Sequence, residues 1–287
     1  MENLKENIFK WIIKILTFIS LILLAFIVIF IFKESIGFFK EVPLFKFISG
    51  KTWNPLGSPD KLSILPIILG TVYVSLIGIL IALPIGVGSA VVLSSYTDKK
   101  TKRVIRSVID ILAGIPSVVY GFVGLLVLVK FFEIRFNFAS GESVLAGGIL
   151  LSIMMLPFII STCDETMEKV YRDYNGYSNA LGVSKPYMIR KIILPESRKS
   201  ILAAIVLALG RGMGETMAVM MVIGNAPIMP KLLKKCQTIP SLIALEMGMA
   251  EVGSLHYHAL FASGFVLIII LFIINIILYF IKKNIDI

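Results

Sequence analysis

The sequence contains little charge for its length. Of its 287 residues, 16% are charged and 57% are hydrophobic, whereas a soluble domain carries about 25% charged residues. The charged residues are confined to short stretches, and long apolar runs lie between them. This pattern excludes an ordinary soluble domain and predicts an all-α integral membrane protein.

Cysteine and histidine are also scarce. The two cysteines, Cys163 and Cys236, are far apart, so the sequence contains neither a disulfide framework nor a CxxC zinc motif. His256 and His258 form an HxH with no HExxH motif and no carboxylate cluster beside it, and we interpret them as a solvated pair in a loop. We therefore expect no metal site and no cofactor.

The sequence lacks a complete ATP-binding loop and any recognisable catalytic constellation. Gly50-Lys51-Thr52 matches the end of a Walker A motif, but the earlier glycine position is Phe45 and no strand precedes it. Energy for an ATP-driven process must therefore come from a separate subunit. Three acidic residues are interpreted as solvated loop charges or as contacts to another protein: Glu142, Glu246 and Glu251.

Long apolar runs are what the sequence does have. A membrane helix needs about 20 mostly apolar residues to cross a hydrocarbon core of about 30 Å. Six segments qualify: 11–32, 64–95, 107–130, 144–163, 201–225 and 259–281. The second carries Pro66 and Pro84, so we expect a kink or break near its middle. The first segment is too long for a signal peptide and is interpreted as a retained helix.

The basic residues predict an orientation. Placing both termini in the cytoplasm leaves clearly more lysine and arginine on the inner side, as the positive-inside rule requires. The same rule accounts for the net charge of +10 without a nucleic-acid partner, because a nucleic-acid groove would need soluble surface that this chain lacks. We divide the chain into an N-terminal helix and outer loop (1–63), a transmembrane core (64–281) and a cytoplasmic tail (282–287).

The longest inner loop, residues 164–200, has a helical pattern. A helix is predicted from Glu165 to Leu181, ended by Gly182. Ser184 then resembles the N-cap of a second helix, which Pro195 would end. In that helix an apolar stripe recurs at helical spacing: Ile189, Ile192 and Ile193. The stripe is consistent with a helix resting on lipid headgroups or with a peg that docks into a cytoplasmic partner.

The same loop resembles a known family. Gly182, nine residues and Ile192-Ile193-Leu194-Pro195 reproduce the second half of the inner-loop signature of binding-protein-dependent ABC permeases. The Glu-Ala-Ala of that signature is replaced by Gly176-Tyr177-Ser178. The resemblance implies a type I importer (MetI-like) fold with six transmembrane helices, and a loop that fits a cleft on the ATPase. The positions that the resemblance assigns to this coupling are Asn179, Ala180, Leu181, Gly182, Ile189, Ile192, Leu194 and Pro195.

Three further segments are similar to the phosphate-uptake permease family PstC. They are Trp53-Asn54-Pro55, residues 114–121 (GIPSVVYG) and residues 210–219 (GRGMGETMAV). The similarity implies a heterodimer with a PstA-like sister permease, two copies of a PstB-like ATPase and a PstS-like phosphate-binding protein, in a bacterial cell membrane. The alternatives are a permease for sulfate, molybdate or tungstate, the sister phosphate permease itself, or a membrane-embedded assembly protein or enzyme.

Two charges lie inside the fifth apolar segment. Arg211 is about 15 Å into it, near the bilayer midplane, and Glu215 follows at i+4 on the same face of the expected helix. Charge at that depth is costly and usually marks a transport pathway, although an ion pair that locks helix packing is the alternative. We assign Arg211, Glu215 and Thr216 to the substrate pathway. An ionised Glu215 would accept the proton of phosphate and repel sulfate, or pair with Arg211 when the site is empty.

Overall fold

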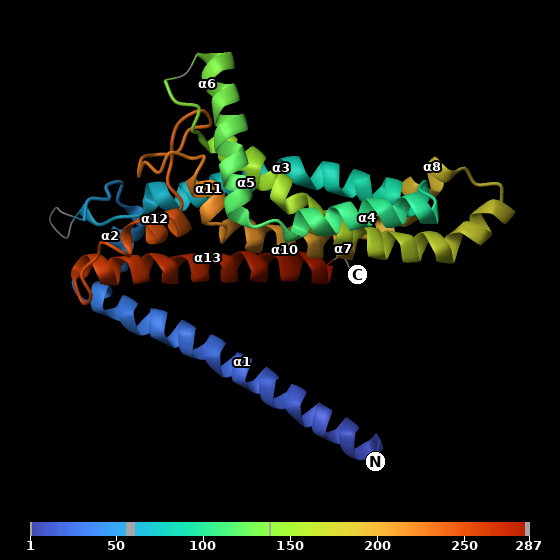
Figure 1. Cartoon of the computed structure of the whole chain (residues 1–287), viewed down its shortest axis with the longest axis horizontal. Coiled ribbons are helices and arrows are strands. Elements are labelled where there is room, and N and C mark those ends of the chain that lie inside the picture. The colour runs from blue at the N-terminus through green and yellow to red at the C-terminus, as the bar shows by residue number, and fades with distance from the viewer. Residues whose placement is uncertain (1, 56–60, 138, 285–287) are drawn as a thin grey trace.

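The chain folds into a bundle of long helices, in accordance with its apolar runs. The computed structural model describes every residue except 1, 56–60, 138 and 285–287 (Figure 1). Its α-helices are α1 (Glu2–Phe39), α2 (Leu44–Ser49), α3 (Leu65–Ser95), α4 (Lys99–Gly114), α5 (Ser117–Val123), α6 (Lys130–Phe136), α7 (Val144–Ala180), α8 (Lys185–Met188), α9 (Leu194–Glu196), α10 (Arg198–Met213), α11 (Met217–Met220), α12 (Ile239–Glu246) and α13 (Leu255–Asn284). Turns of π-helix occupy Gly124–Val129 and Ile189–Ile193.

Helices α3 and α7 form the centre of the bundle. They run side by side, α10 packs against both, and α13 lies beside α10 (Figure 1). Close approach depends on small residues: an added Cβ at Gly86 of α3 would lie 2.6 Å from Ile159 Cγ2 of α7. The main core contains α3 and α7 side chains such as Val74, Leu151 and Met155. Pro84 lies within α3, which continues from Leu65 to Ser95, so the helix is not broken at this proline.

Five helices of the described chain are long and apolar enough to span a membrane. They are Phe9–Phe39, Leu65–Ser95, Ser117–Phe136, Val144–Ala180 and Leu255–Asn284. The sixth predicted segment, 201–225, is divided, because α10 ends at Met213 and a short α11 follows after a break. The glycine-rich run Gly210–Gly214 explains the break, since glycine is a poor helix former and apolar composition alone does not extend a helix.

The third predicted segment, 107–130, is also interrupted. Its first half belongs to α4, and the backbone becomes extended at Ile115 (φ −66°, ψ 129°) before α5 begins at Ser117. Pro116 explains the interruption, because the residue before a proline is driven out of the helical region. The spanning helix therefore starts at Ser117 and runs through the π-helical turn to Phe136.

The loop 164–200 is mostly helical. Helix α7 continues through it to Ala180 without interruption, and Gly182 ends the turn with a left-handed φ of +66°. A second helical run, Lys185–Glu196, includes Pro195 rather than ending there, because Pro195 occupies the first turn of α9. We call residues 177–187 the tip; it lies at the right-hand end of the bundle, which we call the α8 end (Figure 1).

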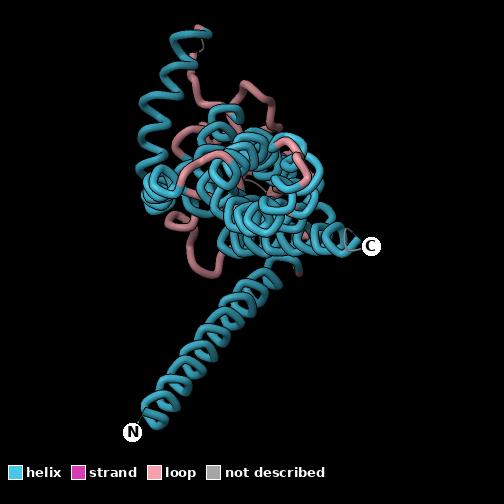
Figure 2. The backbone as a smooth tube through the Cα atoms, turned by 90° about the vertical axis from the view of Figure 1, so that its right-hand side faces the viewer, coloured by secondary structure: helices cyan, strands magenta, loops and turns pink. Residues whose placement is uncertain are grey.

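A second, smaller core lies at the opposite end of the bundle, which we call the α12 end. It joins α1, α2, α12 and α13 through Phe38, Phe47 and Trp53 among others. Much of the aromatic segment 33–55 is therefore packed in this core, apart from residues such as Phe45, which is 78% exposed. From this core α1 diverges away from the bundle (Figure 2). Residues 285–287 of the predicted tail lie outside the described part of the chain.

Candidate translocation site and coupling surface

Arg211 is exposed on the surface of the single chain, near the end of α10. Its guanidinium carbon lies 4.4 Å from the centroid of the Phe158 ring on α7, which is a cation–π contact. Across the described residues, no salt bridge joins Arg211 to a carboxylate. A guanidinium stays charged at any physiological pH and presents a planar fork of donors. Its donors are therefore available to an anion.

Glu215 does not form the predicted i, i+4 pair with Arg211. The helix ends at Met213, so Glu215 falls in the break and its side chain is held elsewhere. Its Oε1 accepts a hydrogen bond from the Ala218 backbone N–H at 3.3 Å, which caps α11. Thr216 Oγ1 donates to the Gly214 carbonyl at 3.2 Å. The break thus carries two half-buried polar side chains beside an exposed arginine.

Helix α5 packs against α11, the helix that follows this break. A Cβ added to Gly121 would lie 2.9 Å from Ala218 Cα and 2.7 Å from Met221 Sδ, so only glycine allows this approach. On the other side, a Cβ added to Gly210 would meet nothing within 4 Å. Arg211 itself is exposed, so this end of α10 is open, whereas α11 is covered by α5 at Ala218.

The tip and the helical run that follows it, residues 177–196, have an inward and an outward surface. Ile193 is fully buried, and Ile189, Ile192 and Leu194 pack partly buried against the main core. The predicted apolar stripe therefore packs at least in part against the chain's own core. The outward surface carries large apolar side chains: Tyr177 (72% exposed), Leu181 (79%) and Tyr187 (56%). Asn179, Ala180 and Gly182 lie exposed beside them.

A group of four charged residues, missed in the sequence analysis, lies between α4 and α7. Asp164 is 2% exposed and accepts hydrogen bonds from Lys102 Nζ (2.7 Å) and from Arg106 Nη2 (2.6 Å). Glu168 contacts the same two cations at 3.0 and 2.8 Å. Each helix supplies its pair at i, i+4 spacing, which is the only trace of this group in the sequence. We call these four residues the charge cluster.

The two histidines are part of packed structure at the α12 end. His256 Nε2 lies 2.8 Å from Glu246 Oε2, and the Trp53 indole N–H donates to the same carboxylate at 3.0 Å. His258 Nδ1 lies 3.2 Å from Glu34 Oε2 on α1. The interpretation as a solvated loop pair was wrong, because both histidines fall in the first turns of α13. Among the described residues no group of three or more His, Cys, Asp or Glu forms a metal site.

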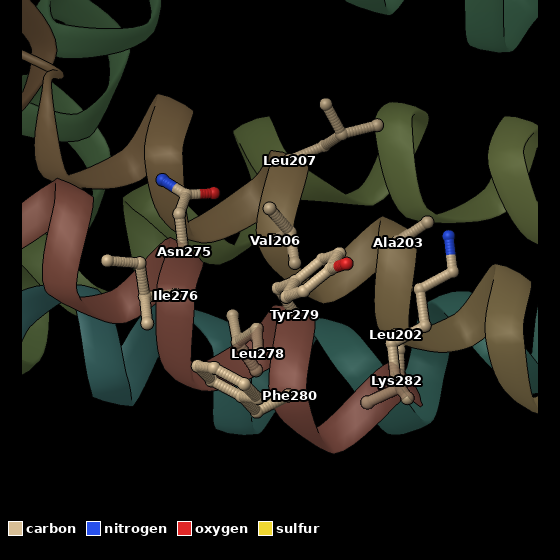
Figure 3. Close-up of a pocket in the computed structure, with 10 residues that line it drawn as sticks. All are labelled: Leu202, Ala203, Val206, Leu207, Asn275, Ile276, Leu278, Tyr279, Phe280 and Lys282. Carbon is tan, nitrogen blue, oxygen red and sulfur yellow. The ribbon is translucent and has the colours of Figure 1, made fainter. Parts of the chain in front are cut away.

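A large cavity lies between α10 and α13 (Figure 3). Its volume is about 740 Å³, and its lining is mainly apolar, from Leu202, Val206 and Leu207 on α10 to Ile276, Leu278 and Phe280 on α13. Asn275 lines it as well, but its amide donates to the Leu271 carbonyl at 2.8 Å. Lys282 also lines the cavity, but a lining that is otherwise mainly apolar fits an oxyanion poorly, so Arg211 is the better candidate for an anion contact.

Comparison with known proteins identifies the family. Residues 82–286 match the family described as "binding-protein-dependent transport system inner membrane component". The chain belongs to this family. It is a multi-pass membrane permease, and permeases of this kind are transport subunits that work with a substrate-binding protein and an ATPase.

The permease is similar to several curated proteins along most of its length. It is 35% identical to the probable ABC transporter permease protein YqgH of Bacillus subtilis, covering 83% of this chain and 78% of that protein. It is 35% identical to the phosphate transport system permease protein PstC of Mesorhizobium japonicum (84% and 79% covered). It is 32% identical to the probable phosphate transport system permease protein PstC of Methanocaldococcus jannaschii (93% and 90% covered).

Solved structures confirm the predicted fold of the permease. The inward-facing MetNI methionine ABC transporter superimposes with a TM-score of 0.57 at 16% sequence identity, covering 77% of this chain and 94% of that one. A second crystal form of the same transporter gives a TM-score of 0.55. At this identity the likeness establishes the MetI-like fold alone.

Proposed function

We propose that this permease forms half of the pathway of an ATP-driven importer of inorganic phosphate. The observation that carries the proposal is Arg211, an exposed arginine with no carboxylate partner among the described residues, at the break between α10 and α11. Two of the relatives above are named phosphate permeases, which supports phosphate as the anion. A guanidinium fork matches the oxygens of phosphate in a way that a lysine ammonium does not.

The membrane environment strengthens the assignment of Arg211 to the pathway. An arginine inside a bilayer costs at least about 2.5–3.5 kcal/mol unless it is paired or faces water. The Arg211 guanidinium stacks on the Phe158 ring, and a cation–π contact of this kind contributes only about 0.5–2 kcal/mol. A water-filled cavity at the contact with the second permease would satisfy the remaining donors and bring a passing anion to them.

Glu215 and Thr216 complete the proposed site. The Glu215 carboxylate has a second oxygen beyond the one that caps α11, and at neutral pH phosphate retains a proton that this oxygen accepts. Sulfate has no such proton and is repelled by the same charge. The site therefore distinguishes the two oxyanions through one carboxylate.

The tip is the proposed docking surface for the ATPase. Its exposed Tyr177 lies near the end of α7, at a position where the family signature would place Glu-Ala-Ala, and its exposed Leu181 follows directly after the helix. Exposed apolar side chains of this size at the end of a rigid helix suit insertion into a cleft of a partner. The assembly we propose contains a PstA-like sister permease, two PstB-like ATPase subunits and a PstS-like phosphate-binding protein. With α10 and α11 together forming the sixth crossing, both termini and the tip lie in the cytoplasm.

Uptake of labelled phosphate by cells that depend on this transporter tests the proposal. Arg211→Ala should abolish uptake while the protein still reaches the membrane, and Arg211→Lys should restore little because it cannot present the fork. Leu207→Ala, one turn earlier on the same exposed face of α10, is the matched control. Full phosphate uptake by Arg211→Ala, or uptake of sulfate in preference to phosphate by the unaltered transporter, would contradict the proposal.

A further inference from the structure

The charge cluster binds α4 to α7 through redundant contacts. Each of its two cations touches both carboxylates: Lys102 Nζ lies 2.7 Å from Asp164 and 3.0 Å from Glu168, and Arg106 Nη2 lies 2.6 and 2.8 Å from the same two residues. Arg106 Nε adds a further bond to Asp164 at 2.9 Å. Removal of Arg106 leaves only the two contacts of Lys102, so a single substitution weakens the connection without separating the helices.

Burial favours a connection that stays closed. The side chains of Lys102 and Asp164 are 9% and 2% exposed. Opening the cluster would leave both charges buried without partners, which is strongly unfavourable in a medium of low dielectric constant. Hydrogen bonds between charged groups are also shorter and stronger than neutral ones. The cluster is therefore expected to persist while other parts of the chain move.

The cluster lies on the helix that leads to the tip. Helix α7 has 37 residues and is about 55 Å long at 1.5 Å per residue. Asp164 is about 30 Å from its start and about 24 Å from its end at Ala180. Because α7 is uninterrupted between Asp164 and the tip, a displacement of the tip moves the cluster with it.

On the other side, the cluster connects to the proposed pathway. Helix α4 continues from Arg106 to Gly114, and the Tyr120 hydroxyl of α5 donates to the Leu112 carbonyl across the break at 2.9 Å. Helix α5 in turn packs through Gly121 on Ala218, whose N–H binds Glu215. Contacts therefore run without a gap from the tip to the residues beside Arg211.

We propose that Lys102, Arg106, Asp164 and Glu168 are positioning residues that form a permanent strut between α4 and α7. The strut makes the two helices move as one body, so that displacement of the tip by the ATPase reaches α5 and the break at residues 214–216. The proposal rests on the proposed function only in that it takes the tip as the surface on which the ATPase acts.

The ratio of phosphate moved to ATP hydrolysed, measured on the whole transporter in proteoliposomes, tests the strut. In Arg106→Gln, Lys102 still bridges both carboxylates, so the chain is expected to fold and assemble. The ratio should fall about tenfold, within the range of coupling between distant sites, while ATP hydrolysis continues. Arg103→Gln is the control: it is an exposed arginine of the same helix with no recorded salt bridge in the described structure, and its ratio should be unchanged.

A covalent replacement separates a strut from a latch that must open. Arg106→Cys with Glu168→Cys removes one cation and one carboxylate, and a short bis-maleimide then rejoins the helices. Both native cysteines are buried, and burial raises the pKa of Cys236 to about 12, so the reagent is directed to the introduced pair. The cross-linked transporter should recover the ratio that the double variant loses.

Each contrary outcome has a distinct meaning. An unchanged ratio in Arg106→Gln, or a parallel fall of uptake and ATP hydrolysis, would overturn the strut. Loss of transport on cross-linking would show that the cluster opens during the cycle and would overturn it as well. Absence of phosphate uptake by the unaltered transporter contradicts the phosphate assignment instead, and the ratio is then measured with sulfate on the same variants.

Discussion

Two arginines of this permease have opposite environments. Arg106 places its guanidinium on Asp164 and Glu168 and shares both with Lys102. Arg211 rests on the Phe158 ring and has no carboxylate partner among the described residues. Charged side chains that pair with one another within the chain hold helices together. A charged side chain with no oppositely charged partner in the described structure is available to a ligand or to another subunit. The difference separates structural from functional charge better than sequence position does.

The largest expected effect concerns stability. Asp164→Ala leaves Lys102 and Arg106 without their buried acceptor and should lower the free energy of unfolding by about 3–5 kcal/mol. Arg211→Ala should change it by less than about 0.5 kcal/mol, as exposed substitutions usually do. Thermal unfolding of both variants in detergent measures the difference. Equal losses of stability would show that the charge cluster that holds Arg106 is no more important to the fold than the exposed Arg211.

A comparison of Leu181 in the tip with Ile193 in the helical run after it gives the next largest effect. Leu181→Asp, on the exposed surface, should weaken binding of the ATPase by about 2 kcal/mol, or roughly thirtyfold, without unfolding the chain. Ile193→Asp buries an unpaired charge in the main core and should destabilise the chain itself. Co-purification of the ATPase together with thermal unfolding distinguishes them. Normal ATPase binding by Leu181→Asp would remove the tip as its docking surface.

Selectivity provides a smaller effect at the proposed anion site. The carbonyl of a glutamine can still accept the Ala218 N–H, so Glu215→Gln should preserve the cap of α11. Without the negative charge, the preference for phosphate over sulfate should fall about tenfold, which corresponds to about 1.4 kcal/mol. Competition between the two anions in uptake assays measures it, with Glu142→Gln as an acidic control away from the site. No gain in sulfate transport would contradict a selectivity role for Glu215.

Much of the fold could be predicted from hydrophobic runs and a few helix-ending residues. The apolar segments correspond to the long helices, and Gly182 ends the α7 turn with the positive φ expected of it. The breaks at Pro116 and Gly214 were not anticipated, because hydropathy averaged along a segment does not report where backbone hydrogen bonds stop. They place Glu215 outside the helix and so remove the predicted pair with Arg211.

Contacts between distant segments could not be predicted from one sequence. Lys102 and Asp164 are 62 positions apart, and only the packing of α4 on α7 brings them together. The stripe containing Ile193 shows a related limit, because periodicity identifies an apolar face without identifying what covers it. Arg211 was found because charge within an apolar run is rare, and its role in transport stays a prediction.

A partly exposed ion pair outside the charge cluster should have the smallest effect. Lys235 Nζ lies 2.6 Å from Glu142 Oε2, with side chains 43% and 27% exposed. Burial alone would raise the pKa of Glu142, but hydrogen bonds from Lys235 and Ser140 hold it below its ordinary value. A lowered carboxyl pKa stabilises the fold above the pKa of the unfolded state, about 4.3, and the contribution disappears as pH falls through the folded value. For a pair this exposed it should be at most about 1 kcal/mol.

Hydrogen exchange of residues 222–236 tests this last expectation, since Lys235 lies in that loop. After correction for the intrinsic exchange rate at each pH, these amides should be less protected at about pH 3.5 than at about pH 6. Glu142→Gln should remove this difference in protection. The charge cluster, buried and redundantly paired, should protect α4 across the same range. If the loop and α4 lost protection together, burial would not be what distinguishes strong from weak charge pairs in this permease.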